Sequence, residues 1–267
     1  MRLDKYLSDL NAGTRKEIRE AVRRGRVRVN GETASDPGMR LSGAEEVLFD
    51  GRRMIREEHV YYMMNKPAGV VCAVTDAKCR TVLDLMGAAR RKDLFPVGRL
   101  DKDTVGLLLL TNDGQFDHRL MSPRRHVEKT YFVRVDGAVS GDDVRAFSKG
   151  LQVDEDFTAL PADLEIVRSG EGSEVYLTIR EGKYHQVKRM FHAVGKEVIM
   201  LKRVSIGALV LDPDLQEGCF RPLREEELDL PVMRTEREFA DLPDGPPEPE
   251  RRIFPGAEPQ IRDDFRC

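Results

Sequence analysis

A continuous apolar run from Val105 to Leu110 is the feature that most constrains the fold of this chain. A short run without polar interruption predicts a β-strand buried on both faces, and the turn sequence Asn112-Asp113-Gly114 ends it. A polar loop with Asp101 and Asp103 comes directly before this strand. We therefore expect a rigid framework to hold this loop on one side. The alternative is structural, because an isolated loop aspartate most often only caps a turn.

Length and charge divide the chain into parts. Its 267 residues and mass of 30.3 kDa favour two domains over one. Apolar residues make up 40%, which is enough for a sizeable core and too many for a wholly disordered chain. The net charge of −3 hides an asymmetry, because residues 1–28 carry a net +5 and residues 225–250 a net −8. The acidic part is also rich in proline, so we expect residues 230–267 to form an extended or disordered tail.

The cysteines and the apolar segments exclude several classes of protein. Four cysteines stand far apart and no C-x-x-C pair occurs, which argues against a disulfide scaffold or a zinc ribbon. The first residues lack the apolar core of a signal peptide, and the apolar run is far shorter than the roughly 20 residues that cross a bilayer. We therefore expect a soluble, cytoplasmic protein with reduced cysteines. The sequence has no phosphate-binding loop, serine-hydrolase elbow or paired histidine motif.

The N-terminal segment has the pattern of a small helical module that ends in a hairpin. Apolar residues at helical spacing predict a first helix over residues 3–10. Thr14 followed by Glu17 is a capping-box signature for a second helix. Alternation over residues 27–29 predicts a half-buried strand, and Asn30-Gly31 is a strong hairpin turn signal because a type I′ turn needs positive φ at both positions.

Basic side chains crowd the second helix and the strand after it, and such clusters can present guanidinium groups to phosphates. The alternative is a solvated helix face with Glu17 and Glu20 as local partners. The order of elements resembles an S4 domain, a small RNA-binding module of helices and a hairpin (the αL type), over residues 1–50, with residues 51–58 as a linker. The RNA-binding candidates in this module are Arg15, Lys16, Arg19, Arg23 and Arg24.

The loop with the two aspartates belongs to a longer and specific stretch. Gly98-Arg99-Leu100-Asp101, with Thr104, Gly106, the leucine run and Thr111-Asn112-Asp113-Gly114, closely resembles the active-site motif of RsuA-type pseudouridine synthases. The match spans about 17 consecutive positions. A resemblance of this length makes a mere turn cap the weaker interpretation of Asp101.

Two further segments resemble the same family. Lys129-Thr130-Tyr131 opens an alternating strand. Residues 175–179 form another, and a glycine turn then leads to a helix that we expect to begin near Tyr184 and to end at Gly195. Backbone N–H groups at the start of that helix favour an anion, although a solvated basic face is the plainer alternative. The basic residues there are Lys183, Lys188 and Arg189.

The resemblance implies an α+β protein, in which residues 59–229 form a catalytic domain with a mixed or antiparallel sheet. Enzymes of this family isomerise uridine in RNA to pseudouridine without a nucleotide cofactor or a metal. By motif position, Asp101 is the nucleophile, Lys188 is the cation that keeps it ionised, and Tyr131 stacks on the extruded uracil. Arg99 fills the gap left in the RNA or holds a phosphate. Whether Asp101 attacks the ribose or the base stays open.

The resemblance also implies the partner and two rival functions. We expect a monomer that acts on structured ribosomal RNA, naked or within an assembling ribonucleoprotein, without membrane contact. The opening residues 1–7 look most like the branch that modifies small-subunit (16S) rRNA. The first rival is a synthase for large-subunit (23S) rRNA. The second, of another class, is an inactive assembly factor that only binds RNA.

Overall fold

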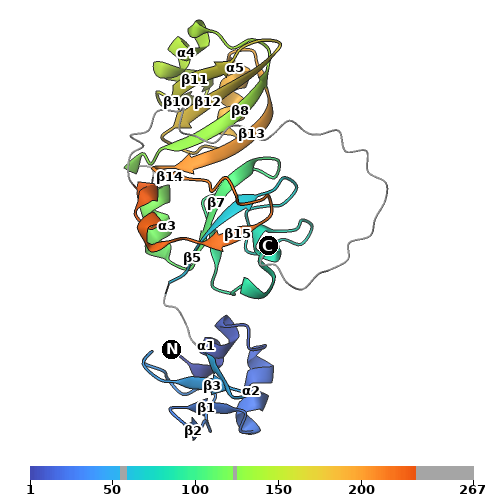
Figure 1. Ribbon diagram of the computed structural model, residues 1–267, viewed down its shortest axis with the longest axis vertical. Coiled ribbons are helices and arrows are strands. Elements are labelled where there is room, and N and C mark those ends of the chain that lie inside the picture. The colour runs from blue at the N-terminus through green and yellow to red at the C-terminus, as the bar shows by residue number, and fades with distance from the viewer. Residues whose placement is uncertain (55–58, 123–124, 233–267) are drawn as a thin grey trace, which may run out of the picture.

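The N-terminal module packs two helices against a small antiparallel sheet (Figure 1). The structure, a computed structural model, describes residues 1–54, 59–122 and 125–232. Leu3, Leu7 and Ile18 are fully buried between the helices and the sheet, as the helical spacing predicts. The elements are α1 (Leu3–Asp9), α2 (Arg15–Arg23), β1 (Val27–Val29), β2 (Glu32–Thr33), β3 (Val47–Phe49) and β4 (Arg52–Met54), with the strands in the order β2-β1-β3-β4.

Local signals set the ends of these elements. The Thr14 hydroxyl accepts a hydrogen bond from Glu17 N (3.3 Å), and the Glu17 carboxylate accepts one from Thr14 N (2.7 Å), so the predicted capping box is confirmed. Asn30 and Gly31 have φ values of 50° and 83°, the left-handed values that the predicted hairpin turn requires. Both signals act within a few residues, which is why sequence alone could reveal them.

The stretch predicted as a linker differs from that prediction. Asp50-Gly51 forms a second hairpin turn between β3 and β4 and does not end the module. The pair Phe49↔Arg52 closes this hairpin, so residues 52–54 belong to the sheet. The remainder of the predicted linker, residues 55–58, lies outside the described residues.

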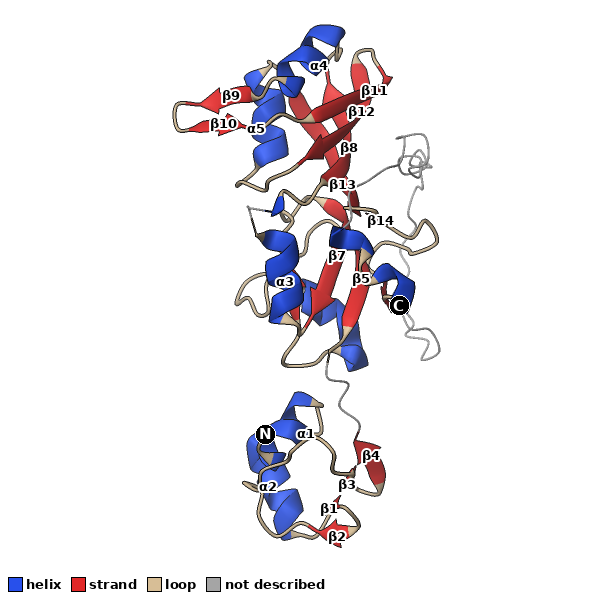
Figure 2. Ribbon diagram, turned by 90° about the vertical axis from the view of Figure 1, so that its left-hand side faces the viewer, coloured by secondary structure: helices blue, strands red, loops and turns tan. Residues whose placement is uncertain are grey.

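The second domain has a large mixed sheet with short helices beside it and a separate two-stranded sheet over residues 151–159 (Figure 2). Nine strands form the large sheet, in the order β11-β12-β8-β13-β7-β5-β15, with β14 on β13 and β6 on β7. The elements are β5 (Tyr61–Lys66), η1 (Val82–Ala89), β6 (Phe95–Val97), β7 (Val105–Thr111), α3 (Gly114–Met121), β8 (Lys129–Asp136), α4 (Gly141–Ser148), β9 (Leu151–Asp154), β10 (Phe157–Ala159), β11 (Asp163–Arg168), β12 (Gly172–Ile179), α5 (Gln186–Ala193), β13 (Glu197–Ile206), β14 (Leu209–Val210), β15 (Phe220–Pro222), η3 (Glu225–Glu227) and η4 (Leu230–Val232).

Strand β7 is buried on both faces, as the apolar run predicts. Leu108 and Leu110 pack into the core cluster on one face of the sheet. Leu107 and Leu109 pack into a separate cluster on the other face, together with Phe116 of α3. A strand that alternated apolar and polar residues would put polar side chains into one of these two clusters. Leucines at successive positions are therefore needed here.

Strands β7 and β13 form a parallel seam between two antiparallel halves of the sheet. The seam joins Lys202 to Val105 and Arg203 to Gly106. A Cβ atom on Gly106 would lie 2.3 Å from the carbonyl oxygen of Arg203, and the φ of Gly106 is 96°. The Arg203 side chain is 2% exposed and donates from Nε to Leu107 O at 2.8 Å. Glycine is required at this position because the two backbones meet there.

Two element boundaries differ from expectation. The helix predicted to begin near Tyr184 begins at Gln186, because His185 has a left-handed backbone that cannot continue a helix. The predicted tail contains a short helical turn, η4, in which Leu230 O accepts a hydrogen bond from Ala208 N at 3.0 Å. The rest of the predicted tail, residues 233–267, lies outside the described residues.

The seam yields a stability prediction. Gly106→Ala should lower the free energy of unfolding by more than about 1 kcal/mol, because it adds both a strained φ and a backbone collision. Gly137→Ala is the matched control, since Gly137 has a φ of 91° and nothing within 4 Å of an added Cβ. Urea denaturation of both variants measures the difference. Equal losses would show that the seam has room for the methyl group.

Candidate active site

The loop before β7 brings its aspartates to the seam, where side chains from distant parts of the chain meet. Asp101 comes from this loop, Tyr131 from β8, and Lys188 from α5. The two halves of the sheet thus contribute to one site. The cavity at this place is lined, among others, by Arg99, Asp101, Thr104, Tyr131, Lys183 and His185.

Asp101 lies beside two groups that can carry positive charge. Lys188 Nζ lies 3.7 Å from its Oδ2, and His185 Nε2 lies 3.5 Å from its Oδ1. The Asp101 side chain is 29% exposed, so it is reachable from solvent and still partly shielded. The carboxylate and the cation singled out by motif position are therefore adjacent in space, although 87 positions separate them in the sequence.

Lys188 is shared with a second carboxylate. Its Nζ donates to both oxygens of Asp103, at 2.6 and 2.7 Å, which are shorter distances than the one to Asp101. The hydrogen bond from Lys188 lowers the pKa of the Asp103 carboxyl, against a smaller rise from burial. Asp103 is 71% exposed, so solvent screens most of this pairing. The sequence indicated Asp103 only as one of two loop aspartates, and its contact with Lys188 became visible in three dimensions.

Tyr131 and Thr104 form the rigid wall of the cavity. Tyr131 is 7% exposed, and its backbone pairs with Leu177 on one side and with Arg203 on the other. Thr104 is 2% exposed, and its hydroxyl has no hydrogen-bond partner within the described part of the chain. A buried hydroxyl without a partner is rare in native proteins, and at a cavity wall it can bond to a bound molecule.

The Lys66 side chain hydrogen-bonds to the backbone of the loop that carries Asp101 and Asp103. The sequence did not indicate this role. The side chain is fully buried, and its Nζ donates to the carbonyl oxygens of Pro67 (3.1 Å), Lys102 (3.3 Å) and Thr104 (2.8 Å). Burial lowers the pKa of this amine, and the neighbouring Cys72, Asp103 and Asp101 offset part of that effect. A lysine at the end of an apolar strand was the available signal, since such a residue is rarely buried without partners.

The turn before α5 is held by one glutamine. Gln186 is 4% exposed, and its Oε1 accepts from Lys183 N at 2.9 Å while its Nε2 donates to Glu181 Oε1 at 2.9 Å. His185 lies in this turn with a φ of 50°, and its Nε2 lies 3.5 Å from Asp101 Oδ1. Its place between Lys183 and Lys188, in the segment that resembles the family, was the only signal in the sequence for this contact.

The other residues predicted to bind RNA differ in whether they form ion pairs within the protein. Arg99 and Lys183 are exposed on the cavity, and within the described ranges no carboxylate lies within 4 Å of either. Arg189 forms an ion pair with Asp154 of β9 and lies over the Phe157 ring, 5.1 Å from its centroid. Arg189 therefore holds the β9–β10 hairpin against α5, a structural contact that the sequence did not reveal.

The basic residues of the N-terminal module are all exposed, but three of the five predicted RNA-binding residues are paired. Arg19 lies 3.5 Å from Asp4, and the partners of Glu20 are Arg23 at 3.5 Å and Arg24 at 3.0 Å. No carboxylate of the described chain lies within 4 Å of the two remaining candidates. These are Arg15 and Lys16.

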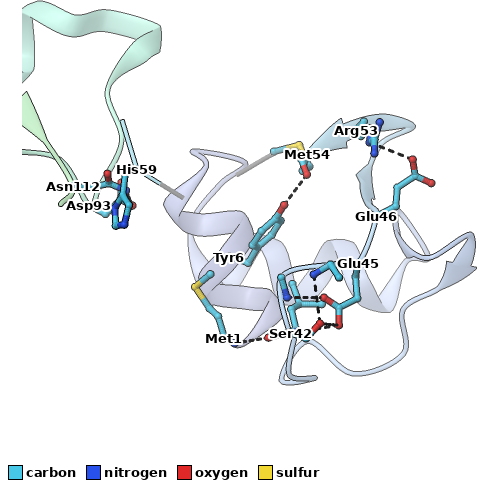
Figure 3. Close-up of a pocket in the computed structure, with 13 residues that line it drawn as sticks. Met1, Tyr6, Ser42, Glu45, Glu46, Arg53, Met54, His59, Asp93 and Asn112 are labelled. Carbon is cyan, nitrogen blue, oxygen red and sulfur yellow. Dashed lines mark hydrogen bonds and ion pairs between the residues drawn. The ribbon is translucent and has the colours of Figure 1, made fainter. Parts of the chain in front are cut away.

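A larger cavity lies elsewhere and carries different chemistry (Figure 3). It is lined by residues of both domains, among them Glu45, Glu46 and Asp93. The Glu45 carboxylate accepts hydrogen bonds from the Ser42 and Gly43 backbone, which lowers its pKa to about 2. Glu46 pairs with Arg53 at 3.3 Å. Glu45, Glu46 and Asp93 make this part of the wall acidic, which disfavours a polyanion there.

The described residues do not meet the requirements of a three-ligand metal site or of a membrane-spanning helix. Over residues 1–54, 59–122 and 125–232, no three His, Cys, Asp or Glu side chains gather in a way that could hold a metal ion. Within the same residues, no helix combines the length and the apolar character needed to cross a membrane.

Both domains match known families. The family described as RNA pseudouridylate synthase matches residues 60–193, and the S4 domain matches residues 1–47. A protein of Bacillus subtilis (strain 168) named "Uncharacterized RNA pseudouridine synthase YtzG" is 46% identical over 233 residues, which are 86% of this chain and 98% of that protein. "Ribosomal small subunit pseudouridine synthase A" of Escherichia coli (strain K12) is 42% identical over 231 residues, covering 85% of this chain and 98% of its own.

A solved structure supports the same assignment of the fold. The structure described as "Crystal structure of pseudouridylate synthase" superposes with a TM-score of 0.62 at 39% sequence identity. It covers 86% of this chain and 99% of its own. A match over this share of the chain includes residues of both domains.

The Lys66 contacts yield a prediction about the aspartate loop. Lys66→Met should lower the free energy of unfolding by at least about 2 kcal/mol, because it leaves buried carbonyl oxygens without a donor. Lys102→Met is the matched control, since Lys102 is an exposed lysine of the same loop. Urea denaturation measures both. A loss no larger than that of the control would mean that other donors or water replace the amine.

Proposed function

The chain belongs to the RNA pseudouridylate synthase family, enzymes that convert uridine in RNA to pseudouridine, and on that premise we propose Asp101 as its nucleophile and one uridine of 16S rRNA as its substrate. The observation that carries the proposal is the ammonium of Lys188, 3.7 Å from Asp101 at a cavity that Tyr131 lines. A carboxylate is ionised at neutral pH and can attack without a separate base. The ammonium attracts the carboxylate electrostatically and offsets its negative charge when RNA expels water from the site.

The reaction is an isomerisation and consumes no other reactant. The bond between N1 of uracil and C1′ of ribose breaks, and a bond from C5 of uracil to C1′ forms. A proton leaves C5 and a proton is gained at N1, so the atoms balance. Asp101 attacks first and leaves again at the end, whether its partner is the ribose or the base. Lys188 stabilises the Asp101 carboxylate before the attack and again after its release.

The cavity wall supplies groups that suit an extruded uracil. Tyr131 offers a ring fixed by strands on both sides, and bases taken out of a stack bind to aromatic faces. The unpartnered Thr104 hydroxyl can bond to an oxygen of the nucleotide. Extrusion of a base costs a few kcal/mol, which must come from contacts elsewhere on the RNA. The basic N-terminal module and Arg99 are suited to provide them.

The choice of 16S rRNA is supported by the relative from Escherichia coli, whose name specifies the small ribosomal subunit. A 23S substrate is the second candidate, because the catalytic motif does not distinguish the two RNAs. We further propose that the protein acts as a monomer on structured ribosomal RNA, naked or within an assembling particle.

The nucleophile is tested by one substitution. Asp101→Asn should reduce pseudouridine formation in 16S rRNA by at least about a thousandfold while RNA affinity stays within twofold, because a carboxamide cannot attack. Mapping of pseudouridine in purified 16S and 23S rRNA, incubated with wild type or variant, measures both points. Asp103→Asn is the control and should keep most of the activity.

Three outcomes would contradict parts of this proposal. Product in 23S rRNA alone would refute the 16S substrate. Activity of Asp101→Asn equal to wild type would refute the nucleophile. A wild type that binds RNA and modifies none would favour the assembly factor.

The N-terminal module yields a prediction about salt dependence. Exchange of both Arg15 and Lys16 for Gln should weaken rRNA binding and flatten its log–log salt dependence by roughly one unit per lost phosphate contact. Lys149→Gln, at an exposed position after α4, is the control for the loss of one positive charge outside the N-terminal module. Filter binding over a series of salt concentrations provides the slopes. An unchanged slope would mean that the two side chains do not contact phosphate.

A further inference from the structure

Tyr184 is more exposed than any other tyrosine or phenylalanine of the described residues. Its exposed fraction is 75%, whereas every other tyrosine of the chain is buried or half-buried. The chain has no tryptophan, and each phenylalanine within the described ranges is also at least half-buried. A single exposed apolar residue needs no explanation by itself, so its surroundings decide what it means.

The Tyr184 ring is stacked on a group of the candidate active site. The rings of Tyr184 and His185 lie with centroids 3.8 Å apart and planes 18° from parallel. His185 Nε2 in turn lies 3.5 Å from Asp101 Oδ1, and His185 lines the same cavity. Only the His185 ring therefore stands between the Tyr184 ring and the proposed nucleophile.

This arrangement is held by several contacts. His185 adopts a left-handed backbone, with φ 50° and ψ 30°, a conformation that is uncommon outside glycine and clusters at functional sites. Arg189 Nη1 donates to Tyr184 O at 3.2 Å, and Arg189 is itself paired with Asp154. Gln186 closes the turn through Lys183 N. The stacked pair thus belongs to a fixed turn and not to a free loop.

The charges around the pair favour an aromatic ligand that carries phosphate. Lys183 precedes Tyr184 directly, and Lys183 and Arg99 both line the cavity with exposed side chains. An aromatic face beside unpaired cations is the combination by which proteins hold single-stranded nucleic acid: the base stacks and the phosphate is neutralised. A protein partner would find a single ring here and no apolar patch around it.

We propose that Tyr184, held by His185, binds the base of a nucleotide that flanks the target uridine. The inference rests on the proposed function, since it takes Asp101 as the place where the target lies. When the target base leaves its stack, its neighbour loses a stacking partner, and the Tyr184 ring replaces it. His185 is a positioning residue in this arrangement, because its ring stacks on Tyr184 and so places the Tyr184 ring relative to Asp101.

The first experiment measures affinity. Wild type, Tyr184→Phe, Tyr184→Leu and Tyr184→Ala are titrated against in vitro transcribed 16S rRNA at one salt concentration. The phenylalanine variant should bind within twofold of wild type, whereas the leucine and alanine variants should bind roughly 5- to 150-fold more weakly, the range found for base–aromatic stacking. Val167→Ala removes exposed apolar surface from the edge strand β11 and should bind like wild type.

The second experiment locates the base. Asp101→Asn protein, with and without Tyr184→Leu, is bound to a 16S fragment that carries 2-aminopurine on either side of the uridine modified by wild type. Because the chain lacks tryptophan, the emission of the probe is read without protein background. We expect Tyr184→Leu to change the emission at one of the two flanking positions while the fragment stays bound.

The outcomes separate this inference from the function on which it rests. Tyr184→Leu binding like wild type, or unchanged emission at both flanking positions with the fragment bound, would overturn it. Leucine and phenylalanine variants that weaken binding equally would also overturn it, because the aromatic ring, which phenylalanine keeps and leucine lacks, would then make no difference to affinity. If wild type modifies no RNA, the proposed function fails, and the affinity series on 16S rRNA still decides whether the ring stacks on a base.

Discussion

The close approach of β7 and β13 is the constraint on which the rest of the second domain depends. One half of the sheet supplies β7 and the other supplies β13, and the two backbones touch at Gly106 and Arg203. The loop with Asp101 leads into one of these strands, and the helix with Lys188 leads into the other. The backbone pairing at the seam therefore places the segments that carry Asp101 and Lys188 next to each other.

Rigidity on both sides of the cavity follows from the same arrangement. Strand β7 is buried by leucines on both faces, and Lys66 holds three carbonyl oxygens around the start of that strand. On the other side, Tyr131 lies in a strand with partners at both edges. A site built on paired strands is held more tightly than a site on free loops, which suits the attack that we propose for Asp101.

The agreement between sequence and structure was best where the signal was local or the motif was long. The capping box at Thr14, the Asn30-Gly31 turn and the doubly buried strand were predictable because each depends on neighbours in the chain. The hairpin at Asp50-Gly51 was misassigned because a turn signal does not say whether the strand after it pairs back. The start of α5 was misplaced by two residues because a left-handed backbone at His185 leaves no trace in a helical pattern.

The sequence by itself determined the family and the presence of an S4 domain before a pseudouridine synthase domain, and it singled out the carboxylate and the cation that we propose for the site. Only the tertiary structure decided that Lys188 is shared by two aspartates, that Lys66 supports their loop, and that Arg189 is bound to Asp154. It also decided that Tyr184 faces solvent beside the site. The reason is physical: charge sharing and exposure depend on which residues distant in sequence become neighbours, and spacing along a chain does not carry that information.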